Sequence, residues 1–250
     1  MRALKLTLAY DGSAYAGWQI QTGQATIQST LETALAQVTG ESIRILGSGR
    51  TDAGVHALGQ VAGLSTQCQL EPEVICRALN ARLPDDIRVL KVEPVVNGFR
   101  AIADATSKLY RYVIHDGTVH NIFSRKYCWH YAKQLDVSAM AQSAGDLVGT
   151  HDFSSFQSTG APRESTIRTV SALSVTRGKD ADQDMVIIEI EADGFLYKMV
   201  RAIVGTLVEV GRGAKRREWP SEVLAARDRS VAGATAPPHG LFLVEVHYGD

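Results

Sequence analysis

The chain has 250 residues and a mass of 27.1 kDa, enough to bury a core as one large domain or two modest ones. Its content of 45% hydrophobic and 21% charged residues is typical of a globular protein, and no apolar run approaches the length that spans a bilayer. The formal net charge of -1 excludes a uniformly basic nucleic-acid binder, so any groups that bind RNA must be gathered on one face.

The first hundred residues predict an α/β order of elements. Alternating apolar residues indicate strands at 4–10 and 87–92. Between them we expect two helices, one capped by Thr26 and stopped by Gly40, the other beginning at Pro72. The first helix places these apolar residues on one face: Ile27, Leu31, Leu35 and Val38.

Residues 98–108 are expected to link this half to a second one. In the second half, Asp136 is predicted to cap a helix and Pro220 to begin a short one. The polar stretch 154–165 is the best candidate for a mobile loop. The other predicted elements are strands at 110–114, 166–176, 185–192 and 242–246 and an apolar helix at 196–207, with Arg201 off its apolar stripe.

A glycine-rich loop, residues 47–57, separates two apolar runs, 43–46 and 58–62, that we expect to be strands. Three glycines in eight residues allow positive φ angles and a close approach to a ligand. Arg50 and Asp52 are two positions apart, so in an extended segment both side chains leave the same face. A guanidinium keeps a nearby carboxylate ionised, and an ionised carboxylate on such a loop is a plausible nucleophile.

The residues alone leave other interpretations of this loop open. A glycine-rich loop with one Asp and one Arg is usually a turn with a local ion pair. A phosphate cradle fits less well, because the spacing of Gly47, Gly49 and Gly54 matches no dinucleotide fingerprint and no Gly-Lys-Ser/Thr follows. On physical grounds Asp52 is therefore one candidate among these alternatives.

No ligand pattern for a metal or a disulfide is present in the sequence. Cys68, Cys76 and Cys128 form no Cys-x-x-Cys pair, and the seven histidines include no His-Glu-x-x-His. The N-terminus lacks the apolar segment of a signal peptide. We therefore expect no metal and a reducing, cytoplasmic setting.

Basic residues are available for one RNA-binding face, although such a cluster is more often a solvated surface. The residues that this face would gather are Arg163, Arg168, Arg201, Arg212, Lys215, Arg216 and Arg217.

Several motifs in shared order resemble those of the TruA-type tRNA pseudouridine synthases. The central one is residues 49–57, Gly-Arg-Thr-Asp-Ala-Gly-Val-His-Ala. The likeness runs nearly from end to end, which makes chance a poor explanation. The other motifs are Tyr10-Asp11-Gly12, Gly17-Trp18-Gln19, Asn80-Ala81-Arg82-Leu83-Pro84, Lys108-Leu109-Tyr110-Arg111-Tyr112, Gly194-Phe195-Leu196-Tyr197-Lys198-Met199-Val200-Arg201 and Gly240-Leu241.

This resemblance implies a fold, an activity and partners. The fold is α/β (α+β), with two similar halves, 1–104 and 105–250, whose mainly antiparallel sheets form a continuous central sheet. Helices lie on one side, and the active-site cleft lies between the halves. The implied activity is that of an isomerase that converts uridine to pseudouridine at positions 38–40, in the anticodon stem-loop of tRNA. The resemblance also implies a homodimer. It implies a reaction without a cofactor and a protein that does not associate with a membrane.

Matched residue by residue, the resemblance also implies roles in the site. Asp52 is the nucleophile, which attacks either C1′ of the ribose or C6 of the uracil. Tyr110 stacks on the extruded base, and Arg201 pairs with Asp52. Arg50 helps to displace the base or, alternatively, contacts a phosphate. Trp18, Gln19 and His56 are expected to be structural or to line the RNA site, and Tyr112 to belong to the core.

The chain departs from the family pattern at one segment. Where the family often has Phe-His-Ala-Arg, this sequence has Phe99-Arg100-Ala101-Ile102, so a basic contact is lost unless Arg100 replaces it. Two other hypotheses remain open: a non-catalytic tRNA-binding protein that aids folding, and a nucleoside hydrolase that uses Asp52 on a small substrate. The combination of Asp52, Tyr110 and Arg201 favours the isomerase.

Overall fold

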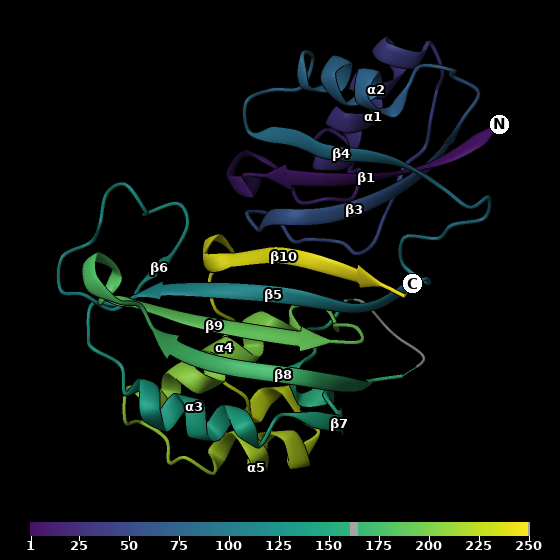
Figure 1. Ribbon diagram of the computed structural model, residues 1–250. Coiled ribbons are helices and arrows are strands. Elements are labelled where there is room, and N and C mark those ends of the chain that lie inside the picture. Colours follow the sequence, from purple (N-terminus) through teal and green to yellow (C-terminus); the bar gives the residue numbers. More distant parts are fainter. Residues whose placement is uncertain (161–164, 250) are drawn as a thin grey trace. The chain divides into compact units, whose positions relative to one another are not determined.

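The computed structural model describes residues 1–160 and 165–249, which divide into two units (Figure 1). Unit 1 comprises Met1–Thr106 together with the chain from Phe242 onward, and unit 2 comprises Ser107–Leu241. The chain from Phe242 onward, which includes most of the last strand, thus packs with the N-terminal unit. The functional division into 1–104 and 105–250 stays a prediction.

Unit 1 is built on one sheet and two helices. Its elements are β1 (Arg2–Tyr10), η1 (Gly12–Ala14), α1 (Ile27–Thr39), β2 (Leu46–Gly47), β3 (His56–Thr66), α2 (Pro72–Asn80), β4 (Ile87–Val95) and β10 (Leu241–Tyr248). The strand order is β4-β1-β3-β10, with β2 paired to β3. All these pairs are antiparallel except β3 with β10, and α2 packs on β4 while α1 packs on α2.

Unit 2 has a sheet in the order β5-β9-β8-β7, with β6 paired to β5. Its strands are β5 (Ala105–His115), β6 (Trp129–His130), β7 (Gly149–Asp152), β8 (Ile167–Arg177) and β9 (Met185–Ala192). Its helices are α3 (Val137–Gly145), η2 (Ser154–Phe156), η3 (Asp180–Asp182), α4 (Met199–Gly211), α5 (Trp219–Ala226), η4 (Arg229–Val231) and η5 (Pro238–Gly240). The pairs are antiparallel except β5 with β6.

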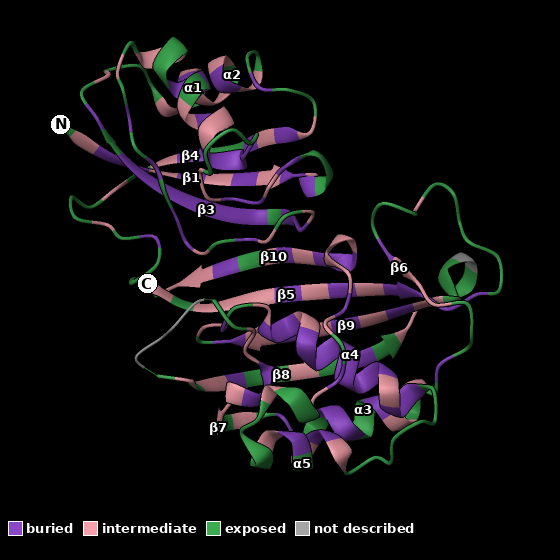
Figure 2. Ribbon diagram, turned by 180° about the vertical axis from the view of Figure 1, so that it is seen from behind, coloured by how far each residue is buried: buried purple, intermediate pink, exposed green. Residues whose placement is uncertain are grey.

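Helices cover one face of the unit 2 sheet, and α4 is the central buried helix. The strands lie in front of α4 in Figure 1 and behind it in the reverse view of Figure 2. Most of α4 is buried, including Met199, Ile203 and Leu207 (Figure 2). Such a helix is apolar on nearly all sides because α3 and α5 each cover part of it, and the sheet lies along another side (Figures 1 and 2).

Most elements lie where the sequence predicts them, because caps and hydrophobic periodicity are local signals. Thr26 accepts a hydrogen bond from the Ser29 amide, and Gly40 ends α1 with a φ of 73°. Asp136 caps α3, and Pro72 opens α2. Both sheets are mainly antiparallel, which confirms the predicted α/β class. A continuous sheet and a cleft between the halves stay predictions.

The structure corrects three details of the predicted elements. A strand over 43–46 is wrong, because only Leu46–Gly47 pairs with β3. Patterns of alternation miss β6 and β7, which are too short to show a period. The expected mobile loop at 154–165 begins with η2, and its residues 161–164, Arg163 among them, lie outside the described residues.

Candidate active site

The Asp52 loop, residues 48–55, connects β2 to β3 in unit 1. Asp52 itself is half-buried, whereas Arg50 is exposed. The Val55 amide donates to the Asp52 carbonyl at 3.1 Å, and Gly54 has a φ of 76°, so the chain turns sharply after the carboxylate. The loop therefore presents the Asp52 carboxylate on a tight turn, with partial access to solvent.

A buried network of side-chain hydrogen bonds supports this loop. Gln60, with 0% of its surface exposed, donates to the Gly49 carbonyl at 3.0 Å and accepts from the Ser48 hydroxyl at 2.7 Å. The Tyr10 hydroxyl lies 2.8 Å from that of Thr51 and 3.4 Å from Gln60 Nε2. Burial raises the pKa of Tyr10 to about 12, although its hydrogen bonds oppose the shift, so the phenol stays neutral. Because unpaired buried polar groups are costly, this network stabilises one loop conformation.

The N-terminal motif Gly17-Trp18-Gln19 packs closely against the backbone of the Asp52 loop and supports it. The Trp18 amide donates to the Thr51 carbonyl at 3.0 Å, and the indole is only 2% exposed. Gly17 has a φ of 94°, and a Cβ at this position would lie 2.5 Å from the Thr51 carbonyl oxygen. Only glycine fits such a close approach. Trp18 is therefore part of the support for the Asp52 loop, and it does not offer its ring to RNA.

His56 follows the loop at the start of β3 and is 1% exposed. Its Nδ1 lies 3.1 Å from the Gly12 amide nitrogen and 3.1 Å from Asp11 Oδ1, and its ring stacks on Phe242 at 4.8 Å. Accepting from the amide requires a bare Nδ1, whereas donating to the carboxylate requires a proton there. The burial makes His56 a structural residue that ties the motif at Tyr10–Gly12 to the loop.

Tyr110 lies on β5 in unit 2, opposite Ile190 of β9. Its side chain is 7% exposed and meets the Phe195 ring edge-on, with ring centroids 5.0 Å apart. This edge-to-face contact orients the Tyr110 ring. Tyr112 on the same face is fully buried and donates to the Pro237 carbonyl at 2.8 Å, which confirms its predicted place in the core.

Arg201 lies in the first turn of α4 and is half-buried. Its Nε donates to the Ala236 carbonyl at 2.7 Å, and the Ala236 amide donates back to the Arg201 carbonyl at 3.0 Å. One turn along, a Cβ on Gly205 would lie 1.7 Å from the Ala234 carbonyl oxygen. The helix and the segment 234–236 are thus in direct backbone contact, and this contact positions the guanidinium.

The four predicted site residues are divided between the units. Asp52 and Arg50 belong to unit 1, and Tyr110 and Arg201 belong to unit 2. The pairing of Arg201 with Asp52 and the stacking of Tyr110 on a base stay predictions. Sequence reasoning missed Gln60 as a supporting residue, although a glutamine inside an otherwise apolar strand is a signal that could have identified it.

The described ranges, 1–160 and 165–249, contain no metal-binding cluster and no membrane-spanning helix. Within them, no group of three or more His, Cys, Asp or Glu side chains is arranged to hold a metal ion. Cys68, Cys76 and Cys128 are free thiols. No helix in the same ranges has the length and apolar character needed to cross a membrane.

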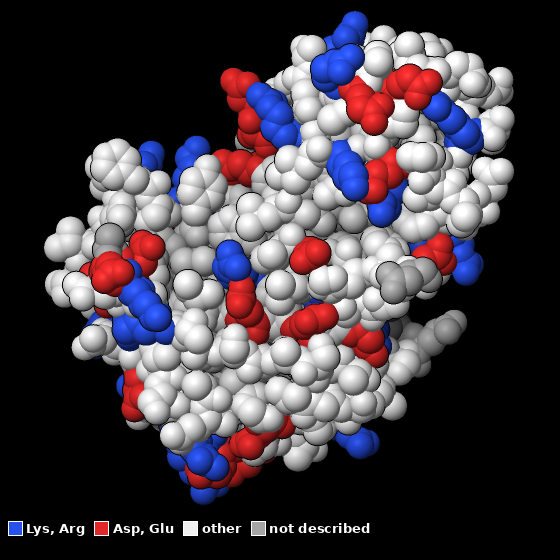
Figure 3. All heavy atoms as spheres, viewed as in Figure 1, with Lys and Arg blue, Asp and Glu red and all other residues white. Residues whose placement is uncertain are grey.

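The basic segment after α4, a candidate for binding RNA, is largely neutralised by neighbouring acids. Ion pairs join Arg212 to Glu209, Arg216 to Glu222 and Arg217 to Glu218. Lys215 lies over the Trp219 ring, 4.9 Å from its centroid. Arg100, the one alternative to the basic contact that is missing at position 102, pairs with Asp104 at 4.0 Å. Acidic and basic side chains are interspersed on the visible surface of each unit (Figure 3).

Fold and site together define an α/β protein that presents a carboxylate on a rigid glycine-rich loop. A family model described as tRNA pseudouridine synthase matches residues 7–101 and 144–249. The chain is 43% identical over 248 residues to tRNA pseudouridine synthase A of a Thermoanaerobacter species, covering 99% of this chain and 100% of that protein. It is 46% identical to the proteins of the same name from Moorella thermoacetica and Brevibacillus brevis, at the same coverage of 99% and 100%. The chain therefore belongs to the tRNA pseudouridine synthase family, which confirms the resemblance seen in its motifs.

Proposed function

We propose that this protein is an isomerase that converts uridine to pseudouridine in the anticodon stem-loop of tRNA, at positions 38–40. The observation that carries the proposal is the half-buried Asp52 carboxylate, presented on a loop that the Gln60 network holds in one conformation. Membership of the tRNA pseudouridine synthase family supports the reaction and the class of substrate.

The reaction needs no cofactor, because it rearranges bonds within the nucleotide and retains every atom. The N1–C1′ bond of uridine breaks, the base turns, and a C5–C1′ bond forms. C5 loses a proton and N1 gains one, so the composition of the nucleotide is unchanged. Asp52 attacks either C1′ or C6, and a carboxylate suits both routes because it can stabilise or trap an electron-poor carbon.

The other proposed site residues act on the carboxylate or on the base. Arg201 pairs with the Asp52 carboxylate. Tyr110 stacks on the extruded uracil, and its ring is already oriented by Phe195. Arg50, exposed beside Asp52, displaces the target base or contacts a phosphate. Removing the base from its stack costs a few kcal/mol, which backbone contacts must offset.

The family resemblance further supports a cytoplasmic homodimer whose functional halves are 1–104 and 105–250. Sedimentation equilibrium of the purified protein tests the dimer, with a single species of twice the 27.1 kDa chain mass as the expected result. A monomer at the concentrations used for catalysis would contradict it.

The proposed reaction is tested by incubating the protein with an unmodified tRNA transcript and mapping pseudouridine at single-nucleotide resolution. We expect product at positions 38–40 with the wild-type protein and none with Asp52→Ala or Asp52→Asn. Asparagine keeps the shape of the side chain and removes its charge, so the pair of variants separates charge from packing. Both variants should still bind tRNA.

Each other result points to a different activity. Pseudouridine formation by Asp52→Ala would refute the nucleophile role. Release of free uracil would favour a hydrolase. Tight tRNA binding by the wild-type protein without any product would favour a folding aid.

A further inference from the structure

The loop that connects β5 to β6, residues 116–128, exposes large apolar side chains. Phe123 is 87% exposed, Val119 81% and Ile122 62%. Most of this β5–β6 loop is coloured as exposed in Figure 2. A group of exposed apolar side chains marks a surface that another molecule covers. The ranges matched by the family model, 7–101 and 144–249, do not include the loop.

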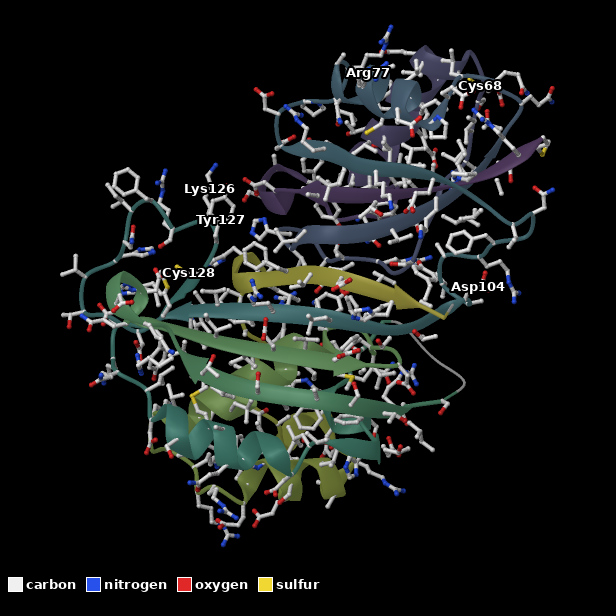
Figure 4. The ribbon with its side chains drawn as sticks, in the orientation of Figure 1. Cys68, Arg77, Asp104, Lys126, Tyr127 and Cys128 are labelled. Atoms are coloured by element: carbon white, nitrogen blue, oxygen red, sulfur yellow. The ribbon has the colours of Figure 1, made fainter. Side chains whose placement is uncertain are left out.

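The exposed charges of the β5–β6 loop are all positive. Arg125 and Lys126 are exposed, and the loop has one acidic residue, Asp116. Asp116 is 3% exposed, and Arg177 binds its carboxylate through two hydrogen bonds of 2.9 and 2.8 Å. Lys126 lies on the part of the loop that rises from the sheet, with Cys128 nearer its base (Figure 4). The exposed charges that the loop itself contributes are therefore cationic, in a chain whose formal net charge is -1, while the exposed Asp184 lies against its first residues.

Hydrogen bonds within the β5–β6 loop give it a defined shape. Asn121 Oδ1 accepts from the Phe123 amide at 3.0 Å and from the Ser124 amide at 3.4 Å. The Tyr127 amide donates to the Ser124 carbonyl at 2.7 Å. A loop that is already ordered loses less conformational entropy when it binds. Phe123 is therefore presented to solvent by a preformed turn.

Stacked histidines support the start of the same loop. The His120 ring lies parallel to the His130 ring, with centroids 4.4 Å apart and an interplanar angle of 7°. Desolvation and then the neighbouring His130, His115 and Arg125 lower the pKa of His120, so it is neutral at neutral pH. The positive charge of the loop thus comes from Arg125 and Lys126.

We propose that the β5–β6 loop is a contact surface for tRNA, in which Phe123 stacks on an unpaired base and Arg125 contacts a phosphate. This inference rests on the proposed function, which supplies the RNA. An exposed aromatic ring beside cations is the combination that binds single-stranded segments of RNA. A second copy of the chain is the alternative occupant, and the monomer–dimer equilibrium distinguishes the two.

The test compares two loop variants with two matched controls on unit 1. The variants are Phe123→Ala and Arg125→Glu. The controls are Val96→Ala, at a side chain that is 79% exposed, and Arg77→Glu, at an exposed position of α2 (Figure 4). The measurements are the Kd for unmodified tRNA over a series of salt concentrations and kcat at saturating tRNA.

We expect both loop variants to weaken tRNA binding without changing kcat. Phe123→Ala should raise Kd roughly tenfold with an unchanged salt dependence, as for the loss of one stacked base. Arg125→Glu should raise Kd at least about tenfold and reduce the slope of log Kd against log salt by about one. Both controls should retain the wild-type Kd. Arg125→Gln, which removes the charge without reversing it, replaces the glutamate variant if circular dichroism shows that the latter is misfolded.

Three outcomes separate this inference from the proposed function. Wild-type Kd values in both loop variants, with normal pseudouridine formation, overturn the loop contact and leave the proposed function intact. A shift in the monomer–dimer equilibrium with unchanged tRNA affinity assigns the loop to a contact between copies, and also overturns it. A protein that makes no pseudouridine but loses tRNA affinity when Phe123 is changed contradicts the proposed function and supports the loop contact.

Discussion

Asp52 in unit 1 and Arg201 in unit 2 depend mainly on different kinds of support. The Asp52 loop is fixed mainly by side-chain hydrogen bonds centred on Gln60, with the close backbone contact at Gly17 as a second support. The helix that carries Arg201 is fixed mainly by backbone contact, because Gly205 of α4 leaves room for the carbonyl of Ala234, and the Arg201 side chain adds one hydrogen bond to the Ala236 carbonyl. The first arrangement depends on polar atoms that are present, and the second depends on a side chain that is absent.

This difference teaches which substitutions each region tolerates. A polar network fails when one group is deleted, since its partners stay buried and unpaired. A tight backbone contact fails when a group is added, since nearby backbone cannot move aside cheaply. Unit 2 also contains a charged anchor, the ion pair of Asp116 with Arg177. Of these three kinds of support, only the ion pair should lose its contribution to stability when the pH falls to the pKa of a carboxyl group.

Removal of the charged anchor should have the largest effect on stability. Asp116→Ala is expected to lower the free energy of unfolding by about 3 kcal/mol, because it leaves Arg177 partly buried without its partner. Urea unfolding at pH 7 measures the difference. A loss below about 1 kcal/mol would show that the pair contributes no more than an exposed one.

The contribution of the Asp116–Arg177 pair to stability should also depend on pH. Burial would raise the pKa of Asp116, but hydrogen bonds from Arg177 and the Leu135 amide outweigh it and hold the pKa below its ordinary value. The stabilisation is therefore complete above the unfolded-state pKa, near 4, and is lost as pH falls through the lower folded-state pKa. The stability gap between wild type and Asp116→Asn should narrow below about pH 4. A gap that is constant down to about pH 2 contradicts this assignment.

Adding a methyl group at Gly205 is the next largest change. Gly205→Ala should cost up to about 3 kcal/mol, since its Cβ would lie 1.7 Å from the Ala234 carbonyl oxygen. It should also lower kcat, because α4 carries Arg201. Gly145→Ala is the matched control: no neighbouring atom lies within 4 Å of its added Cβ. Thermal melts of the two variants should differ clearly, and equal melting temperatures would refute the close contact.

Deleting the centre of the polar network should cost about 2 kcal/mol of stability. Gln60→Leu keeps much of the side-chain volume but leaves the Ser48 hydroxyl and the Gly49 carbonyl without their partner. We expect kcat to fall further than tRNA affinity, because the loop that carries Asp52 loses its support. Gln60→Glu retains the acceptor for Ser48 and should be less damaging. A Gln60→Leu protein with wild-type kcat would show that the Asp52 loop does not depend on the hydrogen bonds of Gln60.

The smallest effect is expected at the edge of the network. Tyr10→Phe removes the hydroxyl that bonds Thr51 at 2.8 Å and should cost about 1 kcal/mol. Because burial raises the pKa of Tyr10 to about 12, the difference from wild type should not change between about pH 6 and pH 10. Chemical unfolding over this range checks the prediction, and a change of more than about 1 kcal/mol argues against a neutral buried phenol.

Local sequence signals determined most elements and the candidate nucleophile. Helix ends are set by residues close by in the sequence, so they can be predicted without knowledge of the fold. The residues that do this are Thr26, Gly40, Pro72 and Asp136. The glycines around Asp52 identified a loop suited to chemistry, and the order of the motifs identified the family. Strand pairs as short as β6 carry no such pattern, which is why they escaped prediction.

Tertiary structure alone decided how the functional side chains are supported. Tyr10 and Thr51 are 41 positions apart, and Arg201 meets Ala236 across 35, so no periodic pattern announces either contact. Tertiary structure also decided that most of the cations at 212–217, although exposed, are paired with glutamates. Composition counts charges, but only packing brings opposite charges within reach of one another, and that depends on where distant segments of the chain meet.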